Sequence, residues 1–325
     1  MSPWPKLLTV LTAALIGASA APSAFSQPYP NKPVRIVVPF AAGSATDIVA
    51  RLLADELRGA FDQSFIVDDK PGASARIGAE VVAKAAPDGY TLLVTTNTSH
   101  SANPHLFKKL SYDPIKDFAP IGGIMNIPVI VVVNPKLPVN SLKELIGYAK
   151  ARPGKVSYGY GNSIGQVTGA AFAKAAAIDV IATPYKSSPQ AMTDLMGEQI
   201  DYAVTDMAAG QALVNTGKLR ALAVSTDRRS SLMPDLPTMA ETPALAGFQL
   251  VAWVAMFAPA GTPAEIVNRL SVEMNKALAK PEIKARIASF SAEVTPSSPE
   301  QLGVFVREQL ASWGKRIKDA GIEPE

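Results

Sequence analysis

Short apolar runs rich in Val and Ile alternate along the chain with segments whose apolar positions recur at helical spacing. Runs of this length bounded by turn residues predict strands, and the intervening pattern predicts helices. The expected strands are 34–39, 65–68, 91–95, 129–133, 156–160, 200–205 and 219–225. The expected helices are 46–60, 74–86, 141–151, 164–177, 189–196, 208–216, 264–279, 281–289 and 299–320. This alternation is typical of an α/β fold in which mainly parallel sheets are flanked by helices.

Two extended apolar segments are longer than the other strands, FAPIGGIMNIPVIVVV at 118–133 and FQLVAWVAMFAP at 248–259. A chain that leaves one domain, builds a second and returns needs such a pair of crossover strands. Two edge strands of one large sheet would have the same pattern. We predict two lobes, residues 27–126 with 250–325 and residues 127–249, with a hinge near Met125–Pro128 and Gln249–Trp253.

The N-terminus has the pattern of an export signal. Lys6 precedes an apolar stretch, Leu7 to Ala18, that is too short to span a bilayer, and small-residue cleavage sites follow at 18–20 and 24–26. We expect residues 1–26 to be a signal peptide and the protein to be periplasmic in a bacterium. The chain has no cysteine, which excludes a disulfide or a lipid anchor on cysteine.

The charge balance does not indicate a nucleic-acid partner. Lys and Arg total 31 against 28 Asp and Glu, the basic residues are scattered, and no aromatic residues are interleaved with them. The chain has neither a G-x-x-x-x-G-K-[ST] nor a G-x-G-x-x-G motif, so no nucleotide cofactor is expected. His100 and His105 have no cluster of carboxylates near them in the sequence, so no metal site is expected either.

A G-x-S-x-G motif at Gly161–Gly165 follows an expected strand and precedes an expected helix, as a hydrolase nucleophile elbow requires. The catalytic His of that fold follows the serine along the chain, whereas both histidines here precede Ser163. A serine–lysine pair would be needed instead, and nothing marks a buried lysine partner. We keep a periplasmic serine hydrolase as the alternative function.

Small and hydroxyl residues gather where the expected strands end: 40–46, 95–101, 161–166, 186–188 and 205–206. Open α/β folds bind ligands at the carboxyl ends of parallel strands, and a following helix offers free N–H groups to an anion. Loops also carry such residues for turn formation, so each segment alone is a weak signal. Five of them, divided between two lobes, predict a cleft that binds carboxylates.

Five segments in the same order resemble the Bug-type receptors of tripartite tricarboxylate transporters. They are YPNKPVRIVVPFAAGSATDIVARLLADEL, APDGYTLLVTTNTSHSANPHLF, PYKSSPQAMTDLMGEQIDYAVTD, GKLRALAVSTDRRSSLMPDLPTMAE and APAGTPAEIVNRLSVEMNKAL. The resemblance covers essentially the whole chain after the leader. It implies a two-lobed Venus-flytrap fold of the type II periplasmic binding protein kind, with two crossover strands, that closes on a small organic acid.

The resemblance also implies where the ligand binds. Transferred by position, the ligand-binding residues of the first lobe are Phe40, Ala41, Gly43, Ser44 and Thr46, with Asp47 capping the helix, and Thr96, Asn97 and Ser99. Those of the second lobe are Gly161, Asn162, Ser163, Gln166, Lys186, Ser187 and Asp206.

Two positions depart from the family pattern. Gln166 stands where the family usually has a histidine, and Ser187 where it has a glycine after Pro-Tyr-Lys. Because Gln carries no charge, we expect the far end of the ligand to be neutral, shorter or held differently.

These observations together predict a monomeric receptor that is not an enzyme and needs no cofactor. It would capture a carboxylate and deliver it to a membrane transporter or a sensor. A purely structural protein is a third and weaker alternative.

Overall fold

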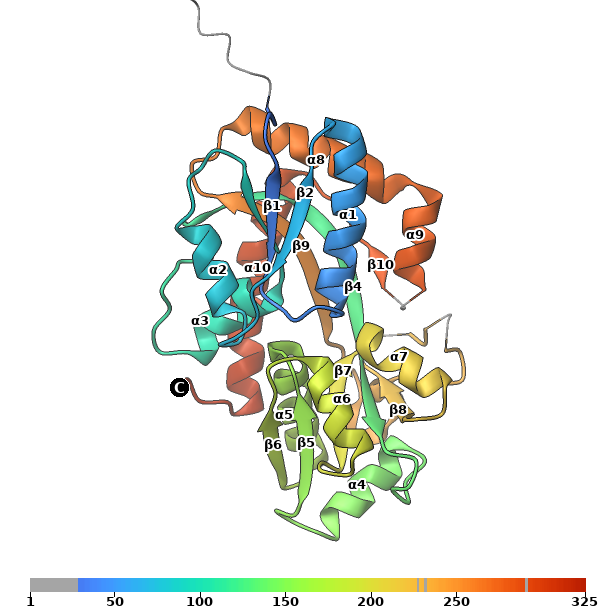
Figure 1. The fold of residues 1–325 in the computed structure, drawn as a ribbon. Coiled ribbons are helices and arrows are strands. Elements are labelled where there is room, and N and C mark those ends of the chain that lie inside the picture. The colour runs from blue at the N-terminus through green and yellow to red at the C-terminus, as the bar shows by residue number, and fades with distance from the viewer. Residues whose placement is uncertain (1–28, 227, 231–232, 290–291) are drawn as a thin grey trace, which may run out of the picture.

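The computed structural model describes residues 29–226, 228–230, 233–289 and 292–325. The expected signal peptide and its cleavage sites lie outside these residues. Two lobes are stacked along the long axis of the molecule (Figure 1). Among the described residues, no helix has the length and apolar character needed to cross a membrane.

The first lobe is built on a sheet that combines parallel and antiparallel pairs. Strand β1 (Val34–Val38) pairs in parallel with β2 (Phe65–Asp69) and with β3 (Thr91–Thr96). Strand β9 (Val251–Pro259) runs antiparallel to β3 and to the first part of β4 (Phe118–Val133), and the short β10 (Glu293–Val294) also pairs with β4.

The second lobe repeats this arrangement. Strand β5 (Val156–Tyr160) pairs in parallel with β6 (Val180–Pro184) and β7 (Tyr202–Asp206). The last part of β4 lies antiparallel between β7 and β8 (Arg220–Val224). The prediction of mainly parallel sheets therefore describes β1–β3 and β5–β7, whereas each crossover strand adds antiparallel pairs.

Strand β4 belongs to both sheets, and its partners change within one residue. Pro128 is opposite Val251 in the first sheet, and Val129 is opposite Asp206 in the second. Pro128 cannot donate a backbone hydrogen bond, which suits a position where one ladder ends. Buried Ser225 joins the two crossover segments here, because its Oγ accepts from Val129 N at 3.0 Å and donates to Leu250 O at 2.5 Å.

Helices cover both sheets. Those of the first lobe are α1 (Ala45–Phe61), α2 (Arg76–Ala83), α3 (Asn103–Leu106), α8 (Ala264–Ala279), α9 (Pro281–Ala288) and α10 (Pro299–Ala320). Those of the second lobe are α4 (Leu142–Lys150), α5 (Ser163–Ala176), α6 (Ser188–Met196) and α7 (Met207–Asn215). A π-helix, η1 (Thr98–Ala102), precedes α3, and two 3-10 turns, η2 (Met239–Glu241) and η3 (Pro243–Leu245), precede β9.

All nine expected helices are present with ends within three residues of the prediction, which confirms the helical pattern. The prediction of a turn at 95–101 was wrong. These residues form the end of β3, Asn97 and most of η1. It also missed β6, an edge strand on which Ile181 is half exposed and which therefore lacks the continuous apolar run of a buried strand.

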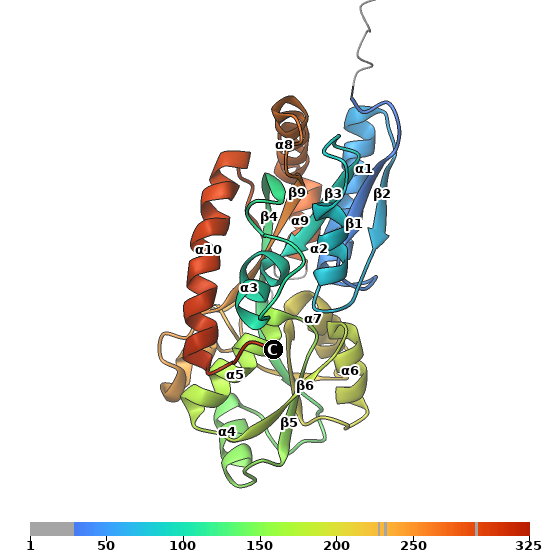
Figure 2. The same cartoon turned by 90° about the vertical axis from the view of Figure 1, so that its left-hand side faces the viewer.

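Helix α10 extends from the first lobe to the second (Figure 2). Its buried Trp313 and Ile317 lie in a hydrophobic cluster that continues through both lobes. The residues after α10 then turn back between the lobes, where Glu325 N donates to Leu106 O at 3.0 Å and Lys108 N donates to Glu325 O at 2.9 Å. The last residues of the chain are therefore fixed at the junction.

Candidate functional site

Helix N-termini from both lobes meet at one small cavity of about 30 Å³, called here the inner cavity. Ser44 caps α1 from the first lobe, and Asn162, Ser187 and Asp206 cap α5, α6 and α7 from the second. The lining residues are Phe40, Ser44, Ala45, Thr46, Thr96, Asn97, Ile127, Gly161, Asn162, Ile164, Ser187, Ser188, Asp206 and Ala252. Helix N-termini carry partial positive charge, so the cavity favours an anion.

The first-lobe wall is a turn that presents main-chain donors. Ser44 Oγ accepts from Asp47 N at 3.3 Å, and helix geometry leaves the N–H groups of Ala45 and Thr46 without an intrahelical partner. Gly43 lies in the left-handed region at φ +80° and donates to Asp47 Oδ2 at 2.8 Å. The cap of α1 is therefore Ser44, and Asp47 closes the preceding turn and pairs with Arg51.

Thr96 at the end of β3 and Asn97, the residue before η1, supply further polar side chains of this wall. Asn97 is fully buried, and its Nδ2 donates to Ser163 Oγ at 3.2 Å. Its Oδ1 has no hydrogen-bond partner within the described part of the chain. A buried amide oxygen without a partner is costly, so this side chain is suited to a ligand group.

The second-lobe wall depends on a glycine. A Cβ on Gly161 would lie 2.1 Å from Ser187 C and from Ser188 N, both of them backbone atoms. Only glycine lets the turn after β5 approach the N-terminus of α6 this closely. Asn162 Oδ1 accepts from Gly165 N at 3.0 Å, which caps α5 and orients the amide at the cavity.

Asp206 fixes the side chains of the second-lobe wall. Its Oδ2 accepts from Ser188 Oγ at 2.8 Å and from Asn162 Nδ2 at 3.4 Å, while Oδ1 accepts from Ala209 N at 3.0 Å. Burial raises the pKa of Asp206 above its usual value, although these hydrogen bonds oppose the rise. The carboxylate acts mainly as an acceptor that orders its neighbours.

The two lobes are also joined directly. Ser163 Oγ donates to Thr98 Oγ1 at 2.9 Å and accepts from Asn97, and all three residues are buried. The imidazole of His100 is bonded to Ser99 Oγ at 2.9 Å, and that of His105 to Leu310 O at 2.8 Å. In the described part of the chain, neither histidine is hydrogen-bonded to Ser163, so the structure does not support the serine hydrolase alternative.

A second, larger cavity of about 240 Å³, called here the outer cavity, adjoins the inner one and shares Phe40, Gly161 and Asn162 with it. The second lobe contributes Tyr160, Ser163, Gln166, Pro184, Tyr185 and Lys186. The first lobe contributes Pro39, 72–75, Thr98, Leu106, Ile322, Glu323 and Glu325. Ala73, Ser74 and Ala75 all have positive φ, which is strained for residues other than glycine.

The structure brings most of the expected site residues to these cavities. Phe40, Ser44, Thr46, Thr96, Asn97, Gly161, Asn162, Ser187 and Asp206 line the inner cavity, and Ser163, Gln166 and Lys186 line the outer one. The remaining four, Ala41, Gly43, Asp47 and Ser99, line neither. Ser99 lies within η1, and its hydroxyl meets Thr95 Oγ1 at 2.7 Å.

Sequence reasoning included some lining residues only as members of a segment and missed others. Ala45, Ile164 and Ser188 line the inner cavity and lie within the expected segments 40–46, 161–166 and 186–188. The apolar residues Ile127 and Ala252 were missed, because they carry no signal that separates them from ordinary core residues. Glu323 and Glu325 lie far along the chain from every other part of the site.

Comparison with known proteins agrees with this geometry. Residues 49–322 match the model of the "Tripartite tricarboxylate transporter family receptor". A UPF0065 protein of Bordetella bronchiseptica is 35% identical, with 97% of this chain and 94% of that protein covered.

Two of the similar solved structures illustrate the likeness in fold and sequence. The structure described as "R. palustris Rpa4515 with adipate" has a TM-score of 0.89 and 34% identity, covering 91% of this chain and 100% of that chain. That of the periplasmic binding protein BugD has a TM-score of 0.87 and 35% identity over the same shares.

Proposed function

Since the chain belongs to the tripartite tricarboxylate transporter family receptors, we propose that it captures a small carboxylate between its lobes and releases it unchanged. We propose further that it acts in the periplasm as a monomer and passes the ligand to membrane transporter subunits or to a sensor. The similarity to a structure that contains adipate supports a carboxylate ligand.

The observation that carries this proposal is the convergence of helix N-termini from both lobes on the inner cavity. Free N–H groups on α1 come from the first lobe, and those on α5 come from the second. Each helix contributes on the order of 0.3–1 kcal/mol of dipole attraction to an anion, in addition to its hydrogen bonds. A carboxylate would thus be held by neutral donors of both lobes.

The proposal assigns the binding of the carboxylate to specific residues of each lobe. The main chain at Ser44–Thr46 and the side chain of Asn97 would hold the carboxylate from the first lobe. Asn162 and Ser187 would hold it from the second, where Asp206 keeps Asn162 and Ser188 in position.

Closure about the crossover strands belongs to the same proposal. We assign residues 27–126 with 250–325 to one lobe and residues 127–249 to the other, which is supported by the change of β4 partners between Pro128 and Val129. A ligand that touches both lobes favours the closed state by its differential affinity. Hydrogen bonds of Ser225 to both crossover segments suit a hinge.

A thermal-shift screen over organic acids tests the proposal. A carboxylate present at a hundred times its Kd stabilises the folded state by about 2.7 kcal/mol, which raises the melting temperature measurably. Scattering at saturation should then show a smaller radius of gyration than without ligand. The proposal fails if no carboxylate raises the melting temperature at millimolar concentration. Turnover of a generic ester by the wild type, lost in Ser163→Ala, would establish the hydrolase alternative instead.

A further inference from the structure

The inner cavity has room for a head group but not for a whole ligand. An ordered water needs roughly 10–15 Å³ of such space, so about 30 Å³ holds two oxygen-sized groups, the size of one carboxylate. The outer cavity is about eight times larger and meets the inner one at Phe40, Gly161 and Asn162. The rest of a longer ligand would therefore lie in the outer cavity, whose side chains meet its far end.

Charged residues of both signs line the outer cavity. The segment after α10 contributes Glu323 and Glu325, and the turn after β6 contributes Lys186. The formal charge of these three side chains is therefore −1. The other side chains around the far end, among them Gln166 and Tyr185, are neutral, and the hydroxyl of Tyr185 donates to Asp194 at 2.8 Å.

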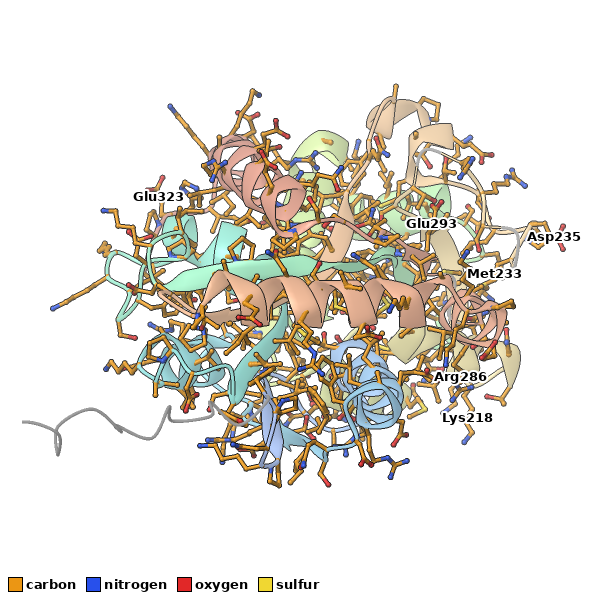
Figure 3. All side chains as sticks on the ribbon, turned by 90° about the horizontal axis from the view of Figure 1, so that it is seen from above. Lys218, Met233, Asp235, Arg286, Glu293 and Glu323 are labelled. Atoms are coloured by element: carbon orange, nitrogen blue, oxygen red, sulfur yellow. The ribbon has the colours of Figure 1, made fainter. Side chains whose placement is uncertain are left out.

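The acidic segment is held firmly against the first lobe. Backbone hydrogen bonds join Glu325 to Leu106 and Lys108 at 3.0 and 2.9 Å. Tyr160 and Glu325 both line the outer cavity, where burial raises the pKa of Tyr160 and the Glu325 carboxylate raises it further. In the view along the long axis, Glu323 lies on the opposite side of the molecule from Glu293 and Met233 (Figure 3).

Lys186 carries the opposite charge to the two glutamates, and its side chain is held less firmly than the segment that carries them. Its side chain is exposed, and it forms no ion pair with any described residue. A lysine ammonium is strongly hydrated and sits on a flexible stem, so ordering it on a ligand costs side-chain entropy. A second carboxylate at the far end of the ligand would be attracted by Lys186 and repelled by Glu323 and Glu325.

We propose that the preferred ligand is a linear acid whose far end is cationic, an ω-amino carboxylate, and that Glu323 and Glu325 select it over the dicarboxylate of equal length. This inference rests on the proposed binding of a carboxylate head group in the inner cavity. What it adds is the chemical nature of the far end of the ligand.

Titration calorimetry with ligands of matched length tests the far end. The probes are 4-aminobutanoate, succinate and butanoate, and the longer set 6-aminohexanoate, adipate and hexanoate. In the better-bound set, the amino acid should bind at least about fivefold tighter than the dicarboxylate, the effect of one to two exposed ion pairs. The double variant Glu323→Gln with Glu325→Gln should reduce that ratio to below about twofold.

A matched control variant separates the effect of the two cavity glutamates from the effect of a change in the net charge of the protein. Glu308→Gln removes an exposed carboxylate from the outside of α10 and should keep the wild-type ratio. Lys186→Gln should raise the ratio further, because it removes the cation that a dicarboxylate uses. The three substituted glutamates are exposed, so folding is checked by an unchanged melting temperature.

Three results would overturn the inference. The first is a dicarboxylate that binds as tightly as the amino acid, and the second is a ratio that the double glutamine variant leaves unchanged. The third is binding of other carboxylates while all six probes fail, which would leave the proposed receptor function intact. Failure of every carboxylate would remove the proposed function together with this inference.

Discussion

The hydroxyl of Ser163, at the start of α5 in the second lobe, donates a 2.9 Å hydrogen bond to Oγ1 of Thr98 in the first lobe. Both residues are buried, and Asn97 Nδ2 completes the contact at 3.2 Å. The lobes thus hold one another through side chains at the edge of the cavity. The serine of the G-x-S-x-G motif joins the two lobes in this structure.

Removal of this contact should weaken the closed state. Ser163→Ala loses a hydrogen bond worth about 0.5–1.5 kcal/mol, so the apparent affinity for a carboxylate should fall by about two- to tenfold. Without ligand, the radius of gyration of the variant should exceed that of the wild type. A double-mutant cycle with Thr98→Ala should give a coupling energy, whereas additive effects would show that the contact does not matter in solution.

Gly161→Ala should damage the second-lobe wall. The new Cβ would meet the backbone of Ser187 and Ser188 at 2.1 Å, so α6 must move away from the cavity. We expect a loss of about 1–3 kcal/mol in the free energy of unfolding and at least about tenfold weaker binding, from overpacking at the site. Gly147→Ala in α4 is the matched control, since no atom lies within 4 Å of its Cβ.

In the control Gly147→Ala, the free energy of unfolding should change in the opposite direction. Replacing a glycine inside a helix by alanine stabilises by roughly 0.5–1 kcal/mol, and Gly147 is remote from the cavities. Chemical denaturation measures both variants. An equal response of the two would contradict the close approach at Gly161.

Ala73→Gly should stabilise the protein. Ala73 is exposed and has φ +47°, and an L-residue there costs roughly 1–2 kcal/mol that glycine avoids, partly offset by the greater freedom of glycine in the unfolded chain. A gain of about 0.5–1 kcal/mol is expected, measured as a rise in melting temperature. Ala311→Gly, at an exposed position inside α10, should instead cost about 1 kcal/mol.

Buried His100 should make stability fall in mild acid. Its ring stacks on Phe257 with centroids 4.1 Å apart, and burial lowers its pKa from 6.5 to about 3. Between these values the unfolded chain binds the proton and the folded chain does not, so this contribution is complete above pH 6.5 and is lost as pH falls toward 3. The slope is up to about 1.4 kcal/mol per pH unit.

The variant His100→Asn tests whether His100 causes this loss of stability in acid. Asparagine does not titrate and keeps a polar group near Ser99 Oγ, the partner of the imidazole. The free energy of unfolding of the variant should vary less with pH between 6.5 and 3 than that of the wild type. Parallel curves for the two proteins would place the acid sensitivity elsewhere.

The sequence alone determined most of the elements and their order, although not β6 or η1. Helices such as Ala264–Ala279 and Pro299–Ala320 appear with the bounds expected from their apolar periodicity and proline starts, because these signals are local. The long run Phe118–Val133 likewise marked a crossover strand. Asn162 and Ser44 were identifiable as site residues because they lie in the polar turns that follow two expected strands.

Tertiary structure alone decided which of these features share a site. Glu325 reaches the outer cavity only because α10 crosses between the lobes, and Ser99 faces away because η1 winds where a turn was expected. The approach of Gly161 to Ser187 likewise depends on the packing of two chain segments. Periodicity and capping depend on neighbours within a few residues, whereas a cavity depends on how distant segments pack, which a local pattern does not contain.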